Sequence, residues 1–165
     1  HLARMSRRRL DIETWRDAML QASSQLDLTL GGEPMDLESK DNKRRTLYGL
    51  IHRREPNQFL RIHDFPDPTA HAPTRPQTIT PLQQLFSLNG PFIHQQAEAL
   101  AVYLMKQTNT ELRIHTVYQK LFQRAPRPTE LKIATEFLAG NENDEAAWIQ
   151  YAHALLASNE FQFIE

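Results

Sequence analysis

The chain has 165 residues, of which 40% are hydrophobic and 24% charged, and its formal net charge is −1. This composition is that of a globular domain and excludes a disordered tail, while the near-zero net charge predicts no nucleic-acid partner. The absence of cysteine excludes disulfides, thiolate metal sites and cysteine nucleophiles. Because no run of about 18 apolar residues occurs, we expect no direct insertion into a membrane.

Basic residues form three clusters in the first third of the sequence: Arg7–Arg9, Lys43–Arg45 and Arg53–Arg54. One hypothesis is a basic ligand-binding module, in which the arginines converge on one face to bind phosphates or acidic polymers. The residues of that face would be Arg44, Arg45, Arg53 and Arg54. However, ten acidic residues are interspersed over residues 1–65, which favours ordinary solvated faces.

The first predicted element is an amphipathic helix from Leu10 to Leu26, with Asp11 as its N-cap. Its apolar residues are spaced by three and four positions and therefore share one stripe. These residues are Ile12, Trp15, Met19, Ala22 and Leu26. An extended exit at residues 26–30 and a polar loop at residues 33–43 follow.

Residues 44–65 contain two segments, "RRTLYGLIHRR" and "NQFLRIHDF", whose conformation is ambiguous. The β-favouring residues Thr46, Tyr48 and Ile51 indicate a short strand, or a hairpin that turns at Pro56 and Asn57. A short helix is the alternative for the second segment.

A proline-rich segment at residues 66–80 should be extended and irregular, because each proline fixes φ and biases its predecessor away from helix. A helix then begins with a capping box, in which Thr80 is the N-cap, Pro81 the first helical residue and Gln83 the reciprocal partner. Its predicted apolar face comprises Leu82, Leu85, Phe86 and Leu88. Asn89 and Gly90 end it, since both tolerate a left-handed backbone.

Further helices are indicated around residues 93–104, 114–122, 129–138 and 145–155, with short connections between them. The sequence therefore predicts a mainly α fold. We expect an irregular bundle of about five to six helices with a proline-rich extended segment and at most one short β-hairpin. Residues 1–165 should form a single domain, with residues 1–65 as its helix and loop region, 66–80 as its proline-rich segment and 81–165 as its helical region.

The neighbourhood of the proline-rich segment holds metal-ligand types of side chain in His63, Asp64 and His71. Their spacing matches no known compact metal site, and Asp67 before Pro68 is typical of an aspartate that accepts a backbone N–H in a turn. No catalytic or cofactor-binding residue is predicted, and no cofactor is expected. Arg75 is predicted to clamp Asp64 or Asp67, or to cap backbone carbonyls.

The segments "RRRLDIETWRDAML", "RRTLYGLIHRR", "HDFPDPTAHAPTRPQTITPLQQLFSLNGPFI", "VYQKLFQRAPRPTEL" and "LLASNEFQFI" resemble, in this order, the planctomycete surface domain family, a domain of unknown function. The signature residues of this resemblance are Phe65, Asp67, Pro68, Arg75, Thr80, Pro81, Gln83 and Asn89. The resemblance implies the C-terminal part of a large exported, periplasmic or cell-surface protein. Its partners would be upstream domains of the same chain, including a cytochrome-c-like domain.

The leading hypothesis is therefore a non-catalytic structural or interaction module, for which the resemblance supplies no catalytic residue. The alternative is an accessory domain of a redox or polysaccharide-related enzyme, with a site shared with upstream domains. That alternative predicts an open polar cleft that gathers His63, Asp64 and Arg75.

Overall fold

The computed structural model describes residues 7–55 and 57–164 and confirms a mainly α fold. These residues contain eight α-helices, one short 3-10 helix and one two-stranded antiparallel sheet. The helices are α1 (Ile12–Ala22), α2 (Gln58–Ile62), α3 (Pro81–Asn89), α4 (Pro91–Met105), α5 (Thr110–Phe122), α6 (Pro128–Leu138), α7 (Glu145–Leu156) and α8 (Asn159–Gln162). The 3-10 helix is η1 (Thr46–Tyr48), and the strands are β1 (Arg8–Arg9) and β2 (Phe163–Ile164). All described helices except α2 and α8 have nine residues or more, which leaves six, at the upper end of the five to six predicted.

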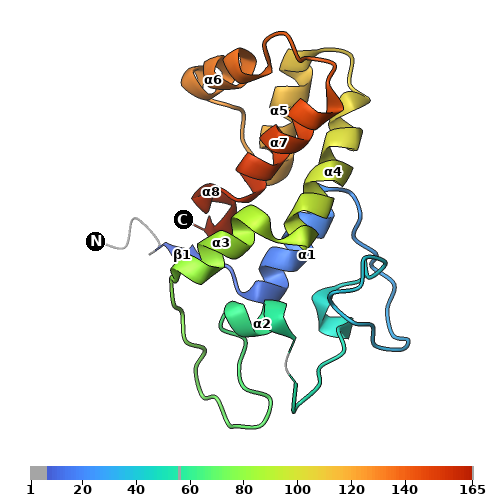
Figure 1. Cartoon of the computed structure of the whole chain (residues 1–165), viewed down its shortest axis with the longest axis vertical. Coiled ribbons are helices and arrows are strands. Elements are labelled where there is room, and N and C mark those ends of the chain that lie inside the picture. Colours follow the sequence, from blue (N-terminus) through green and yellow to red (C-terminus); the bar gives the residue numbers. More distant parts are fainter. Residues whose placement is uncertain (1–6, 56, 165) are drawn as a thin grey trace.

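The centre of the core is the contact between α4 and α7, which lie against each other in the upper part of Figure 1. Leu100 and Leu104 of α4 and Trp148 and Leu156 of α7 are completely buried. Helices α5 and α6 pack around this pair, and α1 packs against α4. Nearly all of the buried hydrophobic side chains form one continuous cluster. Within the described residues, no helix combines the length and apolar character needed to cross a bilayer.

The small sheet lies where the two ends of the described chain meet (Figure 1). Strand β1 pairs antiparallel with β2, with Arg8 opposite Ile164 and Arg9 opposite Phe163. From the sequence we predicted a short strand or hairpin within residues 44–65. The structure corrects this location, because the two strands are formed by Arg8–Arg9 and Phe163–Ile164. Pro56, at the centre of the predicted hairpin turn, lies outside the described residues.

Residues 44–65 form η1 and α2, both of which side-chain hydrogen bonds help to fix. The segment also pairs with earlier residues through two isolated parallel bridges, Asp27 with Arg44 and Met35 with Gly49. Thr46 donates its N–H and its hydroxyl to the Asp17 carboxylate of α1, at 2.7 and 2.6 Å. The Asn57 side chain accepts from the Phe59 N–H at 2.9 Å and caps α2. Phe59 and Leu60 are buried in the core, so helix packing outweighs the β preference of the segment.

Arg16 of α1 attaches the preceding loop to the helical body. Its guanidinium is buried and donates to the carbonyl oxygens of Asn42 and Arg44, at 2.6 and 2.9 Å. Burial lowers the pKa of Arg16 to about 10, which still leaves the group charged at neutral pH. A buried charge requires such partners, so this side chain ties the end of the loop to α1.

The proline-rich segment has no regular structure between residues 65 and 80, as predicted. Helix α3 then starts with the predicted capping box: the Gln83 N–H donates to the Thr80 hydroxyl at 3.3 Å, and the Thr80 N–H donates to Gln83 Oε1 at 3.1 Å. The helix ends at Asn89 without a left-handed residue, since Gly90 has a φ of −66°. Glycine is required at position 90 for space, because a Cβ there would lie 2.6 Å from the Phe86 carbonyl oxygen.

Helix α3 presents its leucines to solvent, contrary to an inward apolar face. Leu82, Leu85 and Leu88 are 57%, 55% and 58% exposed, whereas Gln83 and Ser87 are buried. Of the predicted apolar face, Phe86 alone packs against the hydrophobic core. The polar side of α3 turns inward because it has hydrogen-bond partners there, and the apolar side is left outside.

The orientation of α3 predicts a sharp contrast between two leucine truncations. Leu85→Ala should change the free energy of unfolding by no more than about 0.5 kcal/mol, because the side chain is solvated. Leu100→Ala should lower it by about 2–5 kcal/mol, because it leaves a cavity between α4 and α7. Urea denaturation of both variants measures the difference, and an equally large loss for Leu85→Ala would show that α3 faces the core.

Candidate functional site

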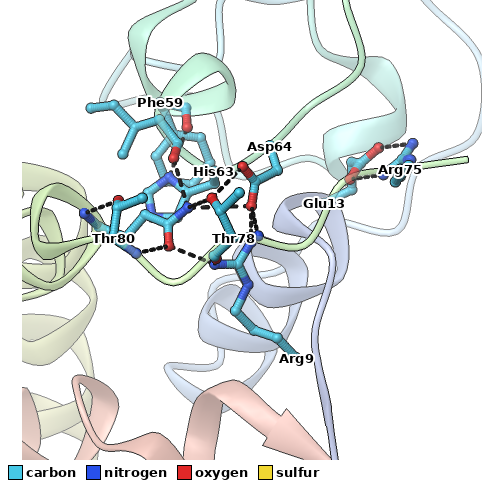
Figure 2. Close-up of polar contacts among 10 residues, drawn as sticks. Arg9, Glu13, Phe59, His63, Asp64, Arg75, Thr78 and Thr80 are labelled. Carbon is cyan, nitrogen blue, oxygen red and sulfur yellow. Dashed lines mark hydrogen bonds and ion pairs between the residues drawn. The ribbon is translucent and has the colours of Figure 1, made fainter. Parts of the chain in front are cut away.

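The junction between the first strand, the end of α2 and the proline-rich segment is the most elaborate polar assembly near the signature residues (Figure 2). Arg9 of β1 donates to the Asp64 carboxylate at 2.6 Å, to Gln83 Oε1 at 2.6 Å and to the carbonyl oxygen of Thr78. The side chains of Arg9 and Asp64 are each 14% exposed. An ion pair so shielded from water requires close partners on both sides, and here it has them.

Asp64 is held as a structural acceptor. Its backbone is left-handed, with a φ of 61°, at the turn that follows α2. Thr78 donates to the carboxylate from its N–H at 2.9 Å and from its hydroxyl at 2.7 Å. Burial alone would raise the pKa of Asp64, but the hydrogen bonds from Thr78 and Arg9 outweigh it and hold the pKa below its ordinary value. With these donors in place, the carboxylate cannot accept a substrate proton without dismantling the junction.

Gln83 connects this junction to α3. Its side-chain amide donates to the Ile62 carbonyl oxygen at 3.0 Å and more weakly to the Asp64 carboxylate, at 3.3 Å. The same side chain completes the capping box with Thr80. One buried glutamine therefore fixes the start of α3 relative to both α2 and β1.

His63 belongs to an aromatic cluster of the core. Its ring centroid lies 5.1 Å from those of Trp15 and Phe86 and 5.4 Å from that of Phe59. Its Nδ1 donates to the Phe59 carbonyl oxygen at 2.9 Å, since a carbonyl only accepts, and Nε2 has no hydrogen-bond partner. Burial lowers the pKa of His63, so the imidazole is neutral at physiological pH.

The three weak metal candidates are in different environments. His63 is buried among aromatic rings, Asp64 is paired with Arg9, and His71 lies exposed on the proline-rich segment. Over residues 7–55 and 57–164, no group of three or more histidine, aspartate or glutamate side chains is placed to hold a metal ion. The structure therefore does not assemble these three residues into a metal centre.

The prediction that Arg75 clamps Asp64 or Asp67 is wrong. Arg75 forms a bidentate ion pair with Glu13 of α1, at 2.7 and 2.8 Å, and its guanidinium lies 5.6 Å from the centroid of the Phe65 ring. Asp64 is already occupied by Arg9. Asp67 accepts from the N–H and hydroxyl of Thr69, at 2.8 and 2.7 Å, in the turn predicted for it.

The remaining signature residues are structural. Asn89 donates its side-chain amide to the Leu85 carbonyl oxygen at 3.0 Å, near the end of α3. Pro81 is the first residue of that helix, and Pro68 lies in the Asp67 turn. These positions support the backbone and present no reactive group.

The four arginines of the predicted basic face lie in two separate regions of the structure. The Arg44 guanidinium donates to the carbonyl oxygens of Thr29, Gly31 and Glu33, and Arg45 pairs with Asp17 at 3.7 Å. Arg53 and Arg54 instead lie beside Arg61, around a separate hollow. The four arginines therefore do not form one surface.

Sequence reasoning missed Arg9, Glu13 and Thr78 as the partners that fix the signature. Arg9 lies 55 residues from Asp64, and Glu13 lies 62 residues from Arg75. In a single sequence, Arg9 is one of three consecutive arginines, and nothing local distinguishes it from its neighbours.

Asp64→Asn should lower the free energy of unfolding at pH 7 by about 1–3 kcal/mol, because it leaves Arg9 without a counterion. The folded pKa of Asp64 lies below the ordinary value of 3.8, so this stabilisation is full above pH 3.8 and is lost as the pH falls below it. Urea midpoints measured from neutral to acidic pH should therefore converge for wild type and variant below about pH 4. The exposed Asp41→Asn is the matched control and should leave the profile unchanged.

His63→Phe tests the neutral histidine. Since the folded pKa of His63 is below 6.5, the wild type loses stability as the pH falls through and below 6.5. The phenylalanine variant keeps the ring packing, so it should start about 1 kcal/mol lower at pH 7 but decline less toward about pH 5. Parallel profiles in urea denaturation would show that His63 is not buried in its neutral form.

A comparison with protein-family models identifies the family to which the chain belongs. The family model described as "PSD1: Protein of unknown function (DUF1553)" matches residues 1–138. No curated protein and no solved structure matches the chain. Because the match covers well over half of the 165 residues, the chain belongs to the PSD1 family, whose function is unknown.

Proposed function

We propose that this domain is a non-catalytic interaction module of a larger exported protein, and that it contacts a neighbouring domain of that protein through α3. The observation that carries the proposal is the outward leucine face of this helix. Together with Ile79, which is 71% exposed, Leu82, Leu85 and Leu88 form an apolar stripe with a spacing of three residues. We call these four residues the α3 stripe. Contiguous exposed apolar groups of this kind are typical of interaction sites.

The surroundings of the α3 stripe indicate an uncharged, apolar partner surface. Residues 76–93 contain no aspartate, glutamate, lysine or arginine, although 24% of the whole chain is charged. The cores of protein interfaces are likewise depleted of charged residues. An apolar helix or strand of a neighbouring domain would bury the leucines without leaving an unpaired charge.

The polar junction supports a structural role over an enzymatic one. The cavity lined by Arg9, His63, Asp64 and Arg75 has a volume of about 10 Å³, which is space for about one water molecule. It is therefore not the open cleft that an accessory enzyme domain would need. The donors and acceptors of the junction bind one another, so their effect is to hold α3 and its exposed face in place.

The identity of the partner and the location come from the resemblance to planctomycete surface domains. On this proposal the α3 stripe contacts an upstream domain of the same chain, of which a cytochrome-c-like domain is one candidate, and the protein acts outside the cytoplasm. The affiliation with an uncharacterised domain family is compatible with this role.

Thiol labelling tests both parts of the proposal, because the chain has no cysteine of its own. Leu85→Cys places a thiol on the α3 stripe, and Ile133→Cys places one on α6, where the native side chain is 64% exposed. In the isolated 165-residue chain, a maleimide should label both thiols at similar rates. In the full-length natural protein, the labelling rate of Leu85→Cys should fall by at least about tenfold, because the partner domain covers this thiol.

A rate for Leu85→Cys that is the same in both proteins would overturn the interface. Protection in the isolated chain that increases with protein concentration would instead assign the α3 stripe to a second copy of this chain. Export is tested with the Ile133→Cys variant and a membrane-impermeant maleimide on intact cells. If only lysed cells are labelled, the cell-surface location is wrong.

A further inference from the structure

A second hollow is lined by the loop before α2, by Arg61 of α2 and by the start of the proline-rich segment. In Figure 1 these segments lie at the end of the molecule opposite α5 and α6. Its volume is about 480 Å³, within the range of small-molecule sites. The lining residues are Arg53, Arg54, Arg61, Phe65, Pro66, Asp67, Pro68 and Thr69. We call it the arginine hollow. It is separate from the polar junction and from the α3 stripe.

Among the described residues, the side chains of the three arginines in this hollow are not paired with other groups of the protein. Arg9, Arg16 and Arg75 each donate to named acceptors elsewhere in the fold. In contrast, the side chains of Arg53, Arg54 and Arg61 make no hydrogen bond, ion pair or ring contact within the part of the chain that the structure describes. Their guanidinium donors are therefore available to a ligand, and none has to be released from an internal contact first.

Asp67 does not neutralise the cluster. Its carboxylate accepts the N–H and hydroxyl of Thr69, and these hydrogen bonds lower the pKa of Asp67. No ion pair joins it to any of the three arginines among the described residues. With three arginines and one aspartate, the lining has a net formal charge of +2. A dianionic ligand would balance this charge.

The guanidinium groups and the apolar residues that line the arginine hollow indicate which class of anion it binds. A guanidinium presents parallel N–H groups that match two oxygens of a phosphate, and several such groups can bind one dianion from different sides. Phe65, Pro66 and Pro68 add apolar surface to the lining, against which an organic body can pack. We propose that the arginine hollow binds a small organic phosphate monoester, with the arginines on the phosphate and the Phe65 and proline surface against its carbon skeleton.

Isothermal titration of the 165-residue chain with glucose 6-phosphate, inorganic phosphate and succinate, at one ionic strength, tests this proposal. Glucose 6-phosphate should bind more tightly than inorganic phosphate, because only the ester has a carbon skeleton that can contact Phe65, Pro66 and Pro68. Succinate should bind more weakly than either, because its two carboxylates are separated. Failure of glucose 6-phosphate to bind, or equal affinities for all three anions, would overturn the proposal.

Substitutions of the lining arginines test whether glucose 6-phosphate binds in the arginine hollow. Arg53→Gln and Arg61→Gln should each raise the Kd for glucose 6-phosphate about tenfold or more, which corresponds to one charge-assisted hydrogen-bonded contact. Arg61→Lys keeps the charge but loses the planar fork, and its Kd should lie between those of wild type and Arg61→Gln. Lys132→Gln on α6 removes the same charge outside the hollow and should leave the Kd unchanged.

All of these residues are exposed, so circular dichroism of the variants should match that of the wild type. An equal rise in Kd for Lys132→Gln would show that the anions bind by general charge attraction and not in the arginine hollow. The labelling rates of Leu85→Cys report a different surface, and failure of either experiment therefore leaves the other proposal standing.

Discussion

The ion pair between Arg9 and Asp64 is the contact on which the lower half of the molecule depends. It joins the first strand to the turn after α2, and through Thr78 and Gln83 it extends to the proline-rich segment and the start of α3. Both side chains are largely removed from water, so neither can lose the other without a substantial cost. A segment rich in proline has no backbone ladder of its own, and this pair fixes its path together with the ion pair between Arg75 and Glu13.

The position of α3 illustrates how polar contacts can decide which side of a helix is buried. Its inner side is satisfied by amides and hydroxyls: Gln162 donates to the Ser87 hydroxyl at 3.4 Å, and His153 donates to the Ser87 carbonyl oxygen at 3.1 Å. At position 83, an apolar side chain would remove an acceptor of Arg9 and the donor to the Ile62 carbonyl oxygen. The leucines are therefore displaced to the outside, where a monomeric protein gains nothing from them.

The sequence was sufficient for those features whose signals are local. The Thr80–Gln83 capping box and the Asp67 turn each depend on residues within three positions, and each is present in the structure. The longer helices follow their apolar spacing. In residues 44–65 the same reasoning failed, because the β preference of Thr46 was overridden by Asp17, which lies 29 residues earlier in the chain.

The pairs of residues that contact each other in the candidate site could not be predicted from a single sequence, because the partners are far apart in the chain. Arg75 could be identified as a clamp from its place in a rigid segment, but its partner, Glu13, is brought near only by the packing of α1. The helical period predicted which residues of α3 share a face, but it carries no information on whether that face is turned inward. That choice depends on distant partners such as Arg9, which is 74 residues from Gln83.

The pairing of β1 with β2 also determines how the fold responds to mechanical force. Because the strands are antiparallel, Arg8 and Ile164 lie at the same end of the two-residue ladder. A pull applied outward at residues 8 and 164 would peel the strands apart one hydrogen bond at a time, which requires less force than shearing all of them together. Peeling would then reach Arg9, whose side chain is anchored to Asp64, Thr78 and Gln83 in the body of the protein. The Arg9 side chain therefore still ties β1 to the body of the protein after the ladder between the strands has opened.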